Sequence, residues 1–392
     1  MSKADRWLLP DGIEENLPAE AHRIEQLRRQ LLDLYQCWGY NFVMPPLVEF
    51  TESLLIGLGR DLDLATFKVT DQLSGKMLGI RADITPQTAR MDAHSLRSNG
   101  INRLCYAGPV LHTKARSPLA TRSPLLSGVE LYGEKTLAAD IEVVSLLLEV
   151  LQICGLENTV VEVGHVGIYR ALIAAAQLSD EQTDTLFDLV QRKAAAEMQQ
   201  WVQANIGDKA LAAILCNLPR LVGDRQSLTQ AKSVLAKAPA SVVDALNTLE
   251  QLTDGIHQRY PNAQLYFDLS ELHGRHYHTG LVFAAFVQGY GRAVATGGRY
   301  DDVGKVFGRA RPATGFHVDV SAVTKLTTQA NPIPTAVYAP LSDDPRQWQV
   351  VQKLRQAGER VITGLNISDD PRALHCDRRL VFVNGQYSVE KL

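Results

Sequence analysis

The sequence predicts an α+β fold, in which an antiparallel sheet is flanked by helices, interrupted by a helical insertion and followed by a small α/β unit. Three observations support this prediction. Residues 264–323 alternate apolar runs with glycine-rich turns, as antiparallel strands do. Alanine, leucine, glutamine and lysine dominate 168–258, which favours helices. A proline-containing linker precedes the last strands. We expect a core of 1–167 and 259–325, an insertion at 168–258 and a C-terminal domain at 326–392.

Composition and charge exclude several classes of protein. The 392 residues are 45% hydrophobic and 21% charged, which is typical of a soluble globular chain. A net charge of -3 provides no global field for binding a polyanion such as RNA. The 5 cysteines are odd in number and lack CxxC spacing, which argues against a disulfide framework. No apolar leader or membrane-length window occurs, so we expect a cytoplasmic protein without membrane contact.

The first elements are a helix and a strand. Apolar residues recur every three or four positions between 19 and 38, which predicts one face of an amphipathic helix. Pro18 suits its first turn and Gly39 its end. The strand 40–44 is halted by Pro45 and Pro46, which lack backbone donors and suit an edge or an interface.

A short strand at 76–81 leads to a candidate polar site. Thr85 and Pro86 are expected to be the N-cap and first position of a helix, with Asp83 just before them. An acidic residue and a hydroxyl beside a helix start could hold a cationic α-amino group. The alternative is that Asp83 and Thr85 are only capping residues.

Two further strands, 102–111 and 128–133, enclose a basic loop, His112 to Arg122. The loop could bind phosphate or could be an ordinary solvated loop. Glu130 lies within the apolar second strand. Because burial of an unpaired carboxylate is costly, Glu130 must face solvent or a polar pocket.

A buried helix at 139–154, capped by Asp140, and a strand at 159–166 precede the insertion, in which Ser179 and Gln182 form a capping box. After the insertion we expect four neighbouring strands, at 264–270, 277–287, 292–297 and 313–320. Gly297 and Gly298 could let a ligand lie against a strand end or could simply bend the strand. The C-terminal domain should hold a strand, a helix and two strands.

These features resemble the class II aminoacyl-tRNA synthetases, and histidyl-tRNA synthetase most of all. The segments that carry the resemblance read LPDGIEEN and VMPP (motif 1), YAGPVLHTKARSPLATRSPLLSGVELYG (motif 2), and GGRYDDV with PATGFHVDVSAV (motif 3). The likeness covers Trp7 to about Val323.

The chain departs from the synthetases where ATP would bind. The motif 2 arginine that holds the α-phosphate falls in a stretch that reads His112, Thr113, Lys114. The glutamate and arginine that end motif 3 are replaced by Ser321 and Ala322. The histidine-specific arginine pattern becomes the stretch 273–278, which reads HGRHYH. Since one contact to developing charge is worth on the order of 10² to 10³ in rate, we expect no adenylation and no catalytic residues.

The amino-acid side of the pocket is better preserved. The resemblance implies that Asp83 and Thr85 bind the α-amino group of histidine and that Glu130 faces the imidazole. By the same resemblance, the wall of the pocket is Tyr277 and its floor is formed by the two glycines Gly297 and Gly298. Leu126 replaces a glutamine of the synthetases.

This combination is similar to the regulatory subunits of ATP phosphoribosyltransferase, which are non-catalytic paralogues of histidyl-tRNA synthetase. The resemblance implies a short catalytic subunit as partner, a homodimer through the motif 1 region within a hetero-octamer, and histidine as inhibitory effector. We expect no cofactor, no metal and no tRNA. The C-terminal segment is shorter than an anticodon-binding domain.

Three alternatives remain open from the sequence. The chain could be a divergent histidyl-tRNA synthetase. It could hold zinc on His273, His276 and His278, although no carboxylate or cysteine lies at ligand spacing. It could also be a dimeric scaffold that binds no small molecule.

Overall fold

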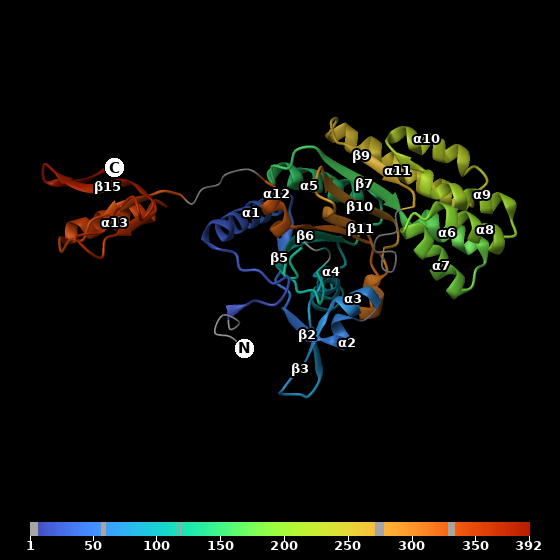
Figure 1. The fold of residues 1–392 in the computed structure, drawn as a ribbon, viewed down its shortest axis with the longest axis horizontal. Helices are drawn as coiled ribbons and strands as arrows, with labels where there is room; N and C mark the ends of the chain where they lie inside the picture. The colour runs from blue at the N-terminus through green and yellow to red at the C-terminus, as the bar shows by residue number, and fades with distance from the viewer. Residues whose placement is uncertain (1–6, 56–59, 116, 118–119, 271–277, 328–333) are drawn as a thin grey trace. The chain divides into compact units, whose positions relative to one another are not determined.

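The computed structural model describes residues 7–55, 60–115, 117, 120–270, 278–327 and 334–392. The chain divides into two compact units, Met1–Gln329 and Ala330–Leu392. Figure 1 shows their helices and strands, coloured from blue at the N-terminus to red at the C-terminus and labelled where there is room. No helix in these described stretches has the length and apolar character needed to cross a bilayer.

The first unit is built on a nine-stranded sheet in the order β1-β5-β6-β12-β11-β10-β7-β9-β8, counted over the described residues. All the central pairs are antiparallel, while β1–β5 and β7–β9 are parallel. The predicted flanked antiparallel sheet is thereby confirmed. The strands are β1 (Asn41–Phe42), β5 (Asn102–Pro109), β6 (Leu125–Tyr132), β7 (Thr159–His165), β8 (Val222–Gly223), β9 (Leu265–Asp268), β10 (Leu281–Val287), β11 (Ala293–Arg299) and β12 (Ala313–Asp319).

The expectation of four neighbouring strands after the insertion is wrong in one respect. Strands β10, β11 and β12 are neighbours, but β7 lies between β10 and β9. Because β7 and β9 run parallel, the chain between them must make a long crossover, and the helical insertion is that crossover.

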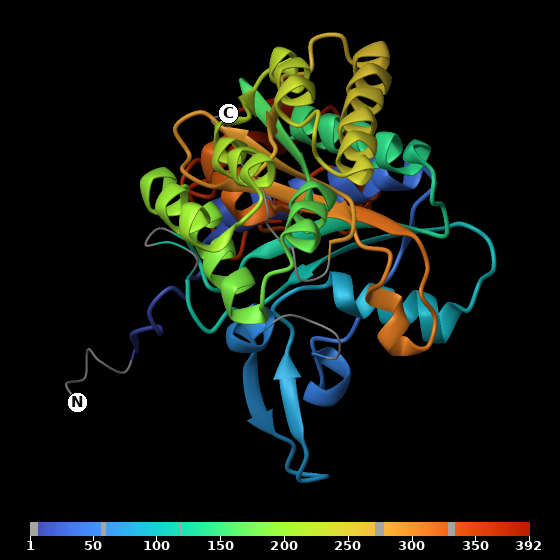
Figure 2. The ribbon, with the colours of Figure 1, turned by 90° about the vertical axis from the view of Figure 1, so that its right-hand side faces the viewer.

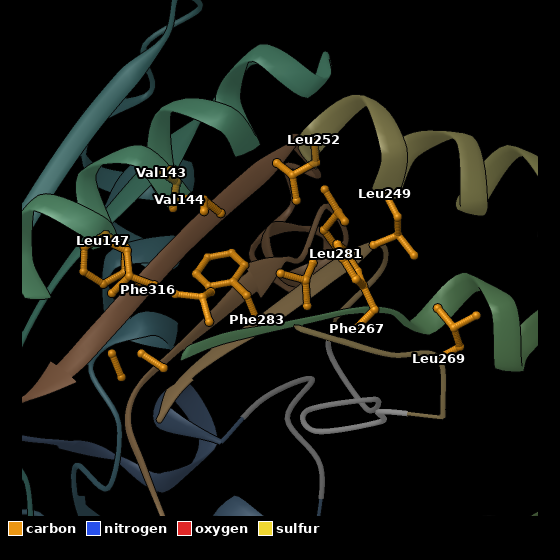
Figure 3. Close-up of a cluster of buried hydrophobic side chains, with 14 of the residues drawn as sticks. Val143, Val144, Leu147, Leu249, Leu252, Phe267, Leu269, Leu281, Phe283 and Phe316 are labelled. Atoms are coloured by element: carbon orange, nitrogen blue, oxygen red, sulfur yellow. The ribbon is translucent and has the colours of Figure 1, made fainter. Parts of the chain in front are cut away.

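One face of the sheet carries the hydrophobic core. The register places Val129, Phe316, Gly297, Phe283 and Val163 in a single row across five strands. Figure 3 shows phenylalanines of this face directed toward side chains of α5 and α11. The helices that cover it are α1 (Pro18–Cys37), α5 (Leu137–Ile153) and α11 (Ala240–Arg259). The opposite face is left for other contacts, because side chains alternate along a strand.

Two predicted helix caps are wrong. Helix α5 begins after Thr136, so Asp140 lies in its first turn and is buried rather than capping. Helix α4 (Thr85–Arg90) has Ile84 at its N-cap position, so Thr85 is its first helical residue. In both places the polar side chain bonds a distant group instead of the helix end. A π-helix, Met91–Leu96, follows α4 directly.

The insertion is helical, with one addition that the composition did not reveal. Its short strand β8 pairs with β9 and so extends the main sheet. The capping box of Ser179 and Gln182 is confirmed at the start of α7. The remaining elements are α6 (Val166–Ala176), α7 (Asp180–Gln191), α8 (Ala195–Asn205), α9 (Lys209–Asn217), a 3-10 turn (Leu218–Arg220) and α10 (Arg225–Val234).

A smaller sheet of order β2-β4-β3 precedes α4. In Figure 2 its blue strands extend away from the main sheet of the same unit. Its elements are β2 (Val48–Phe50), α2 (Thr51–Leu54), α3 (Arg60–Ala65), β3 (Phe67–Thr70) and β4 (Met77–Ile80). Strand β11 leads through a 3-10 turn (Val303–Phe307) to β12 and then to α12 (Val320–Leu326).

The second unit is a four-stranded sheet of order β14-β13-β15-β16 with one helix. Strand β13 runs parallel to both of its neighbours. The last strand, Gln386–Lys391, is not among the predicted elements. All of its residues except Tyr387 are exposed. The elements are β13 (Ala336–Ala339), α13 (Pro345–Gln356), β14 (Val361–Thr363), β15 (Cys376–Val383) and β16 (Gln386–Lys391).

Candidate functional site

The candidate site is centred on Glu130, in the middle of β6 on the face opposite the core. Its side chain is 1% exposed and is surrounded by hydroxyl groups. Oε1 accepts hydrogen bonds from Thr85 Oγ1 at 2.8 Å and from the hydroxyl of Tyr106 at 3.2 Å. Oε2 accepts one from the hydroxyl of Tyr300. A buried carboxylate is tolerated here because several donors satisfy it.

Burial raises the pKa of Glu130 to about 8, against an ordinary value of 4.5. The hydroxyls of Tyr300, Thr85 and Tyr106 oppose this rise, while the negative charge of Asp83 adds to it. Desolvation therefore dominates, and the carboxyl group can be neutral near pH 7. A group poised in this way can donate or accept a proton in contact with a titratable ligand.

The hydroxyl cluster continues past Glu130. The hydroxyl oxygens of Tyr300 and Tyr132 lie 3.3 Å apart, and Thr88 Oγ1 lies 3.0 Å from the same Tyr132 oxygen. The rings of Tyr132 and Tyr300 pack edge to face with centroids 6.3 Å apart. Two strands and helix α4 are thus joined by polar contacts around one carboxylate.

Asp83 lies beside this cluster, at the turn into α4. Its Oδ1 accepts hydrogen bonds from the backbone N–H of Ile84 at 2.6 Å and of Thr85 at 3.2 Å. The side chain is half-buried. Asp83 therefore shapes the turn, as the capping alternative held, while Thr85 directs its hydroxyl to Glu130. The turn-shaping role of Asp83 does not exclude a role of Asp83 and Thr85 in binding a ligand.

The two predicted floor glycines lie on opposite faces of β11. Gly298 shares a cross-strand row with Gly315 and Glu130, so it lies on the site face. A Cβ at Gly315 would collide with Glu130 Oε2. A Cβ at Gly297 would instead meet the carbonyl oxygen of Gly315, the ring of Phe283 and the Cβ of Phe316. The structure brings together Asp83, Thr85, Glu130 and Gly298.

Tyr277, the predicted wall, lies outside the described residues. The chain becomes described again at His278, whose ring lies 2.8 Å from where a Cβ of Gly298 would be. The next residue, Thr279, donates from its backbone N–H to the carbonyl of Arg299 at 2.7 Å. His278 and Thr279 are therefore held against the end of β11 that carries Gly298.

A buried ion pair fixes the strand end that carries Tyr300. The guanidinium of Arg299 binds Asp140 of α5, with Nη2 to Oδ2 at 2.6 Å and Nε to both oxygens at 3.1 and 3.2 Å. It also donates to Asp301 at 3.2 Å. Arg299 is 8% exposed and Asp140 is 2% exposed. Breaking a pair buried this deeply would leave an uncompensated charge, so the pair holds the loop after β11 in place.

Sequence reasoning missed Tyr300, Tyr106 and Gly315 as members of the site. Each stands in a quoted motif: Tyr300 follows the glycine pair, Tyr106 opens motif 2 and Gly315 lies in motif 3. Alternation along β5 and β12 would have placed Tyr106 and Gly315 on the face of Glu130 once the register was known. The register itself depends on long-range pairing, which one sequence does not specify.

Two residues at altered motif positions, His112 in motif 2 and Ser321 in motif 3, bond the backbone of the protein itself. His112 is 3% exposed and its Nε2 lies 2.9 Å from the carbonyl of Ala82, next to Asp83. Ser321 Oγ accepts a hydrogen bond from the backbone N–H of Leu125 at 3.0 Å. Both side chains therefore contribute hydrogen bonds within the fold.

Arg122 of the basic loop is also held by contacts within the protein. Its guanidinium donates to the backbone carbonyls of His112 at 3.0 Å and Asp11 at 3.0 Å, and it stacks on Phe67. It ties the loop to the N-terminal segment instead of remaining available for phosphate.

A partly open pocket of about 410 Å³, including its mouth, lies at this nucleotide end. It contains one cation that the sequence analysis did not single out, Arg292. The Arg292 guanidinium donates to the hydroxyl of Tyr290 at 2.5 Å and lies 3.9 Å from Asp319. Its charge is therefore offset locally. The lining residues are His112, Thr121, Pro124, Leu126, Arg292, Ala293, Val294, Ala295, Thr296, His317 and Asp319.

No group of three histidine, cysteine or acidic side chains is placed to hold a metal ion within the described stretches. Of the three histidines in the zinc alternative, His273 and His276 lie outside those stretches. The hydroxyl cluster around Glu130 is suited to an organic ligand with hydrogen-bonding nitrogens, because its donors are neutral and fixed.

Two family models match the chain. Residues 12–323 match the model described as histidyl-tRNA synthetase, and 334–390 match "ATP phosphoribosyltransferase subunit HisZ C-terminal domain". The chain is similar at full length to the ATP phosphoribosyltransferase regulatory subunits of Cellvibrio japonicus, with 56% identity over 100% of this chain and 98% of the relative, and of Teredinibacter turnerae, with 54% identity over 100% of both.

Solved structures agree with this assignment. An ATP phosphoribosyltransferase regulatory subunit/histidyl-tRNA synthetase from Bacillus halodurans superimposes with a TM-score of 0.83 at 27% identity, covering 95% of this chain and 97% of that one. Histidyl-tRNA synthetase from Nostoc shares the fold, with a TM-score of 0.78 at 17% identity over 98% of this chain and 94% of that one. The synthetase-like core, its altered nucleotide end and its matched C-terminal domain together place this chain in the family of ATP phosphoribosyltransferase regulatory subunits.

Proposed function

We propose that this chain activates a short catalytic subunit, which transfers phosphoribose from phosphoribosyl pyrophosphate to ATP, and that it makes this reaction sensitive to histidine. The observation that carries the proposal is the buried Glu130 carboxylate and its fixed hydroxyls, on a fold whose aligned motif 2 and motif 3 arginine positions read His112 and Ala322. A ligand site without ATP-binding groups suits sensing better than catalysis.

Histidine would bind with its imidazole toward Glu130 and its ammonium group toward Asp83. A neutral Glu130 can donate to an imidazole nitrogen, and an ionised one can accept from an imidazole N–H. Either arrangement keeps a hydrogen-bond partner for a carboxyl group that is 1% exposed in the structure. To admit the ring, one of the hydroxyls now bonded to Glu130 must give up its place.

Feedback inhibition would require two states of the complex that differ in their affinity for histidine. A ligand shifts a conformational equilibrium only by its differential affinity for the two states. The site is well placed for such a shift, because Thr85, Tyr106 and Tyr300 come from three separate elements and their hydroxyl groups converge on Glu130.

Assembly is proposed to be a homodimer through the motif 1 region, within a hetero-oligomer with the catalytic chain in a bacterial cytoplasm. Large apolar side chains are exposed there, and a two-fold dimer would bury one copy of this surface against another. The net charge of -3 gives no support for tRNA binding. The exposed residues are Phe42, Met44, Leu47, Val48 and Phe50.

Co-purification with a short catalytic subunit tests the proposal. We expect a stable complex, turnover that requires both chains, and inhibition by added histidine. A complex that is active but indifferent to histidine would remove the effector role. Failure to associate with, or to activate, a catalytic subunit from the same organism would contradict the activating role.

A further inference from the structure

A second buried ion pair, between Arg311 and Asp92, joins segments that are 219 positions apart in sequence. Arg311 precedes β12, and its Nη1 lies 2.8 Å from Asp92 Oδ1 and 3.0 Å from Oδ2. The two residues are 8% and 1% exposed. Arg311 Nη2 also donates to the carbonyl of Gly100, and the side-chain amide of Asn102 donates to Asp92 Oδ1. These further hydrogen bonds satisfy the remaining polar atoms, as a buried ion pair requires.

Asp92 belongs to the same helical segment as Thr85. The π-helix follows α4 without a break, because Met91 keeps a helical backbone with φ -62° and ψ -43°. Thr88 lies between the two residues, and its hydroxyl donates to the carbonyl of Thr85 at 2.8 Å. A tether at Asp92 therefore helps to fix the position of Thr85, whose hydroxyl bonds Oε1 of Glu130 at 2.8 Å.

The other partner, Arg311, lies next to the backbone that holds Tyr300. Two residues after Arg311, the carbonyl of Ala313 accepts a hydrogen bond from the backbone N–H of Tyr300 at 2.8 Å. The N–H of Ala313 in turn donates to Asp301 Oδ1 at 3.0 Å. The hydroxyl of Tyr300 donates to Oε2 of Glu130. The ion pair thus connects the two segments that supply donors to the two oxygens of one carboxylate.

The end of β6 leaves room for the guanidinium of Arg311. Gly133 has a φ of 95°, and a Cβ at this position would collide with Arg311 Nη2. The backbone N–H of Gly133 donates to the carbonyl of Pro312 at 2.7 Å. Gly133 directly follows Tyr132, a member of the hydroxyl cluster, so the pair is also fixed against the strand that carries Glu130.

We infer that Arg311 is a positioning residue for histidine binding: its ion pair with Asp92 holds Thr85 and Tyr300 in place on either side of Glu130. This inference rests on the proposed function. Without the pair, the helical segment and the end of β11 would no longer be tied together, and the site would lose part of its preorganisation.

The test measures histidine dissociation constants by calorimetry on the full chain in complex with its catalytic subunit. We expect Arg311→Met to weaken histidine binding roughly 5- to 10-fold, within the range of coupling between residues that share a network. Arg311→Lys should retain part of the affinity, because its ammonium group keeps the charge but not the planar fork of donors.

A double variant separates positioning from stability. Arg311→Met leaves the buried Asp92 carboxylate without its charge partner, which is strongly unfavourable. Asp92→Asn combined with Arg311→Met removes both charges, so the double variant should fold even where the single variant does not. Thermal unfolding should show that it regains most of the stability lost in Arg311→Met. Its histidine affinity should stay reduced, because the tether is still absent.

Arg103→Met is the matched control. Arg103 binds Glu142 with Nε 2.7 Å from Oε1. It is the neighbour of Leu104, which pairs with Glu130, so its side chain points to the opposite face of the sheet. We expect wild-type histidine affinity in this variant.

Wild-type affinity in Arg311→Met, or losses of equal size in Arg311→Met and Arg103→Met, would overturn the inference alone. A double variant that regains affinity together with stability would also overturn it, since the pair would then serve only the fold. Absence of histidine binding by the wild-type complex would overturn the proposed function and this inference with it.

Discussion

Two regions on the second face of the main sheet, one around Glu130 and one beside Leu126, differ sharply. At the amino-acid end, Glu130 keeps a buried carboxylate satisfied by three hydroxyl groups. At the nucleotide end, four residues away along β6, the pocket beside Leu126 is bordered by His112, whose imidazole bonds a backbone carbonyl. Buried polar side chains in the two regions are therefore satisfied differently, by side-chain hydroxyls around Glu130 and by the backbone at His112.

The difference lies in the hydrogen-bond partners that the buried polar side chains have. A side chain that no longer contacts a ligand still needs a hydrogen-bond partner when it is buried. The side chains of His112 and Ser321 have hydrogen-bond partners within the protein, a backbone carbonyl and a backbone N–H respectively. At the other end, the hydroxyls around Glu130 could exchange their bonds for bonds to a ligand of similar polarity.

The largest expected effect is at Glu130. We expect Glu130→Gln to weaken histidine binding by about 10- to 100-fold, because hydrogen bonds to charged or proton-sharing groups contribute about 1.5–3 kcal/mol. Glutamine preserves the volume and an acceptor for Thr85. Inhibition curves for the complex measure the effect, with Glu142→Gln as control, since Glu142 binds Arg103 elsewhere. Undiminished inhibition in Glu130→Gln would place the effector site elsewhere.

A smaller loss is expected at Asp83. Asp83→Asn keeps an oxygen for the backbone N–H groups of Ile84 and Thr85, so the turn should persist while the charge that attracts an ammonium group disappears. We expect roughly 5- to 10-fold weaker histidine binding, within the range of charged hydrogen bonds. Asp83→Ala should in addition lower stability by about 1 kcal/mol, as loss of a cap does. Equal affinity in the asparagine variant and the wild type would show that Asp83 serves only the turn.

The raised pKa of Glu130 predicts a pH dependence of stability. The folded state holds the proton more tightly than the unfolded chain, because the pKa is about 8 against an ordinary 4.5. The stabilising contribution is fully present below about pH 4.5 and is lost as pH rises through about 8. The unfolding midpoint of the wild type should therefore fall relative to Glu130→Gln by a few degrees as pH rises from about 6 to 9. Parallel curves would contradict a neutral buried carboxyl group.

The smallest expected signal is at the nucleotide end. With ATP, histidine and pyrophosphate, the isolated chain should show no exchange above a blank without protein, because the aligned positions of the phosphate-binding arginines read His112 and Ala322. An active histidyl-tRNA synthetase serves as positive control. Histidine-dependent exchange by this chain would remove the contrast between the two ends and restore the synthetase alternative.

Local patterns predicted much of the fold. The apolar periodicity of 19–38 gave α1 to within one residue at each end, and Ser179 with Gln182 gave the start of α7. These signals are local, because capping and amphipathic periodicity act within a few residues of the chain. The caps assigned to Asp140 and Thr85 were wrong because each side chain has a partner far away in sequence, Arg299 and Glu130 respectively.

By itself, the sequence determined the class of fold, the loss of the nucleotide-binding arginines and the identity of Asp83, Thr85 and Glu130 as candidate ligand residues. Only the tertiary structure decided which side chains meet at Glu130, that Gly297 and Gly298 face opposite ways, and that β7 separates β9 from β10. The physical reason is that residue types and local periods are written along the chain, whereas strand register and burial arise from contacts between segments distant in sequence.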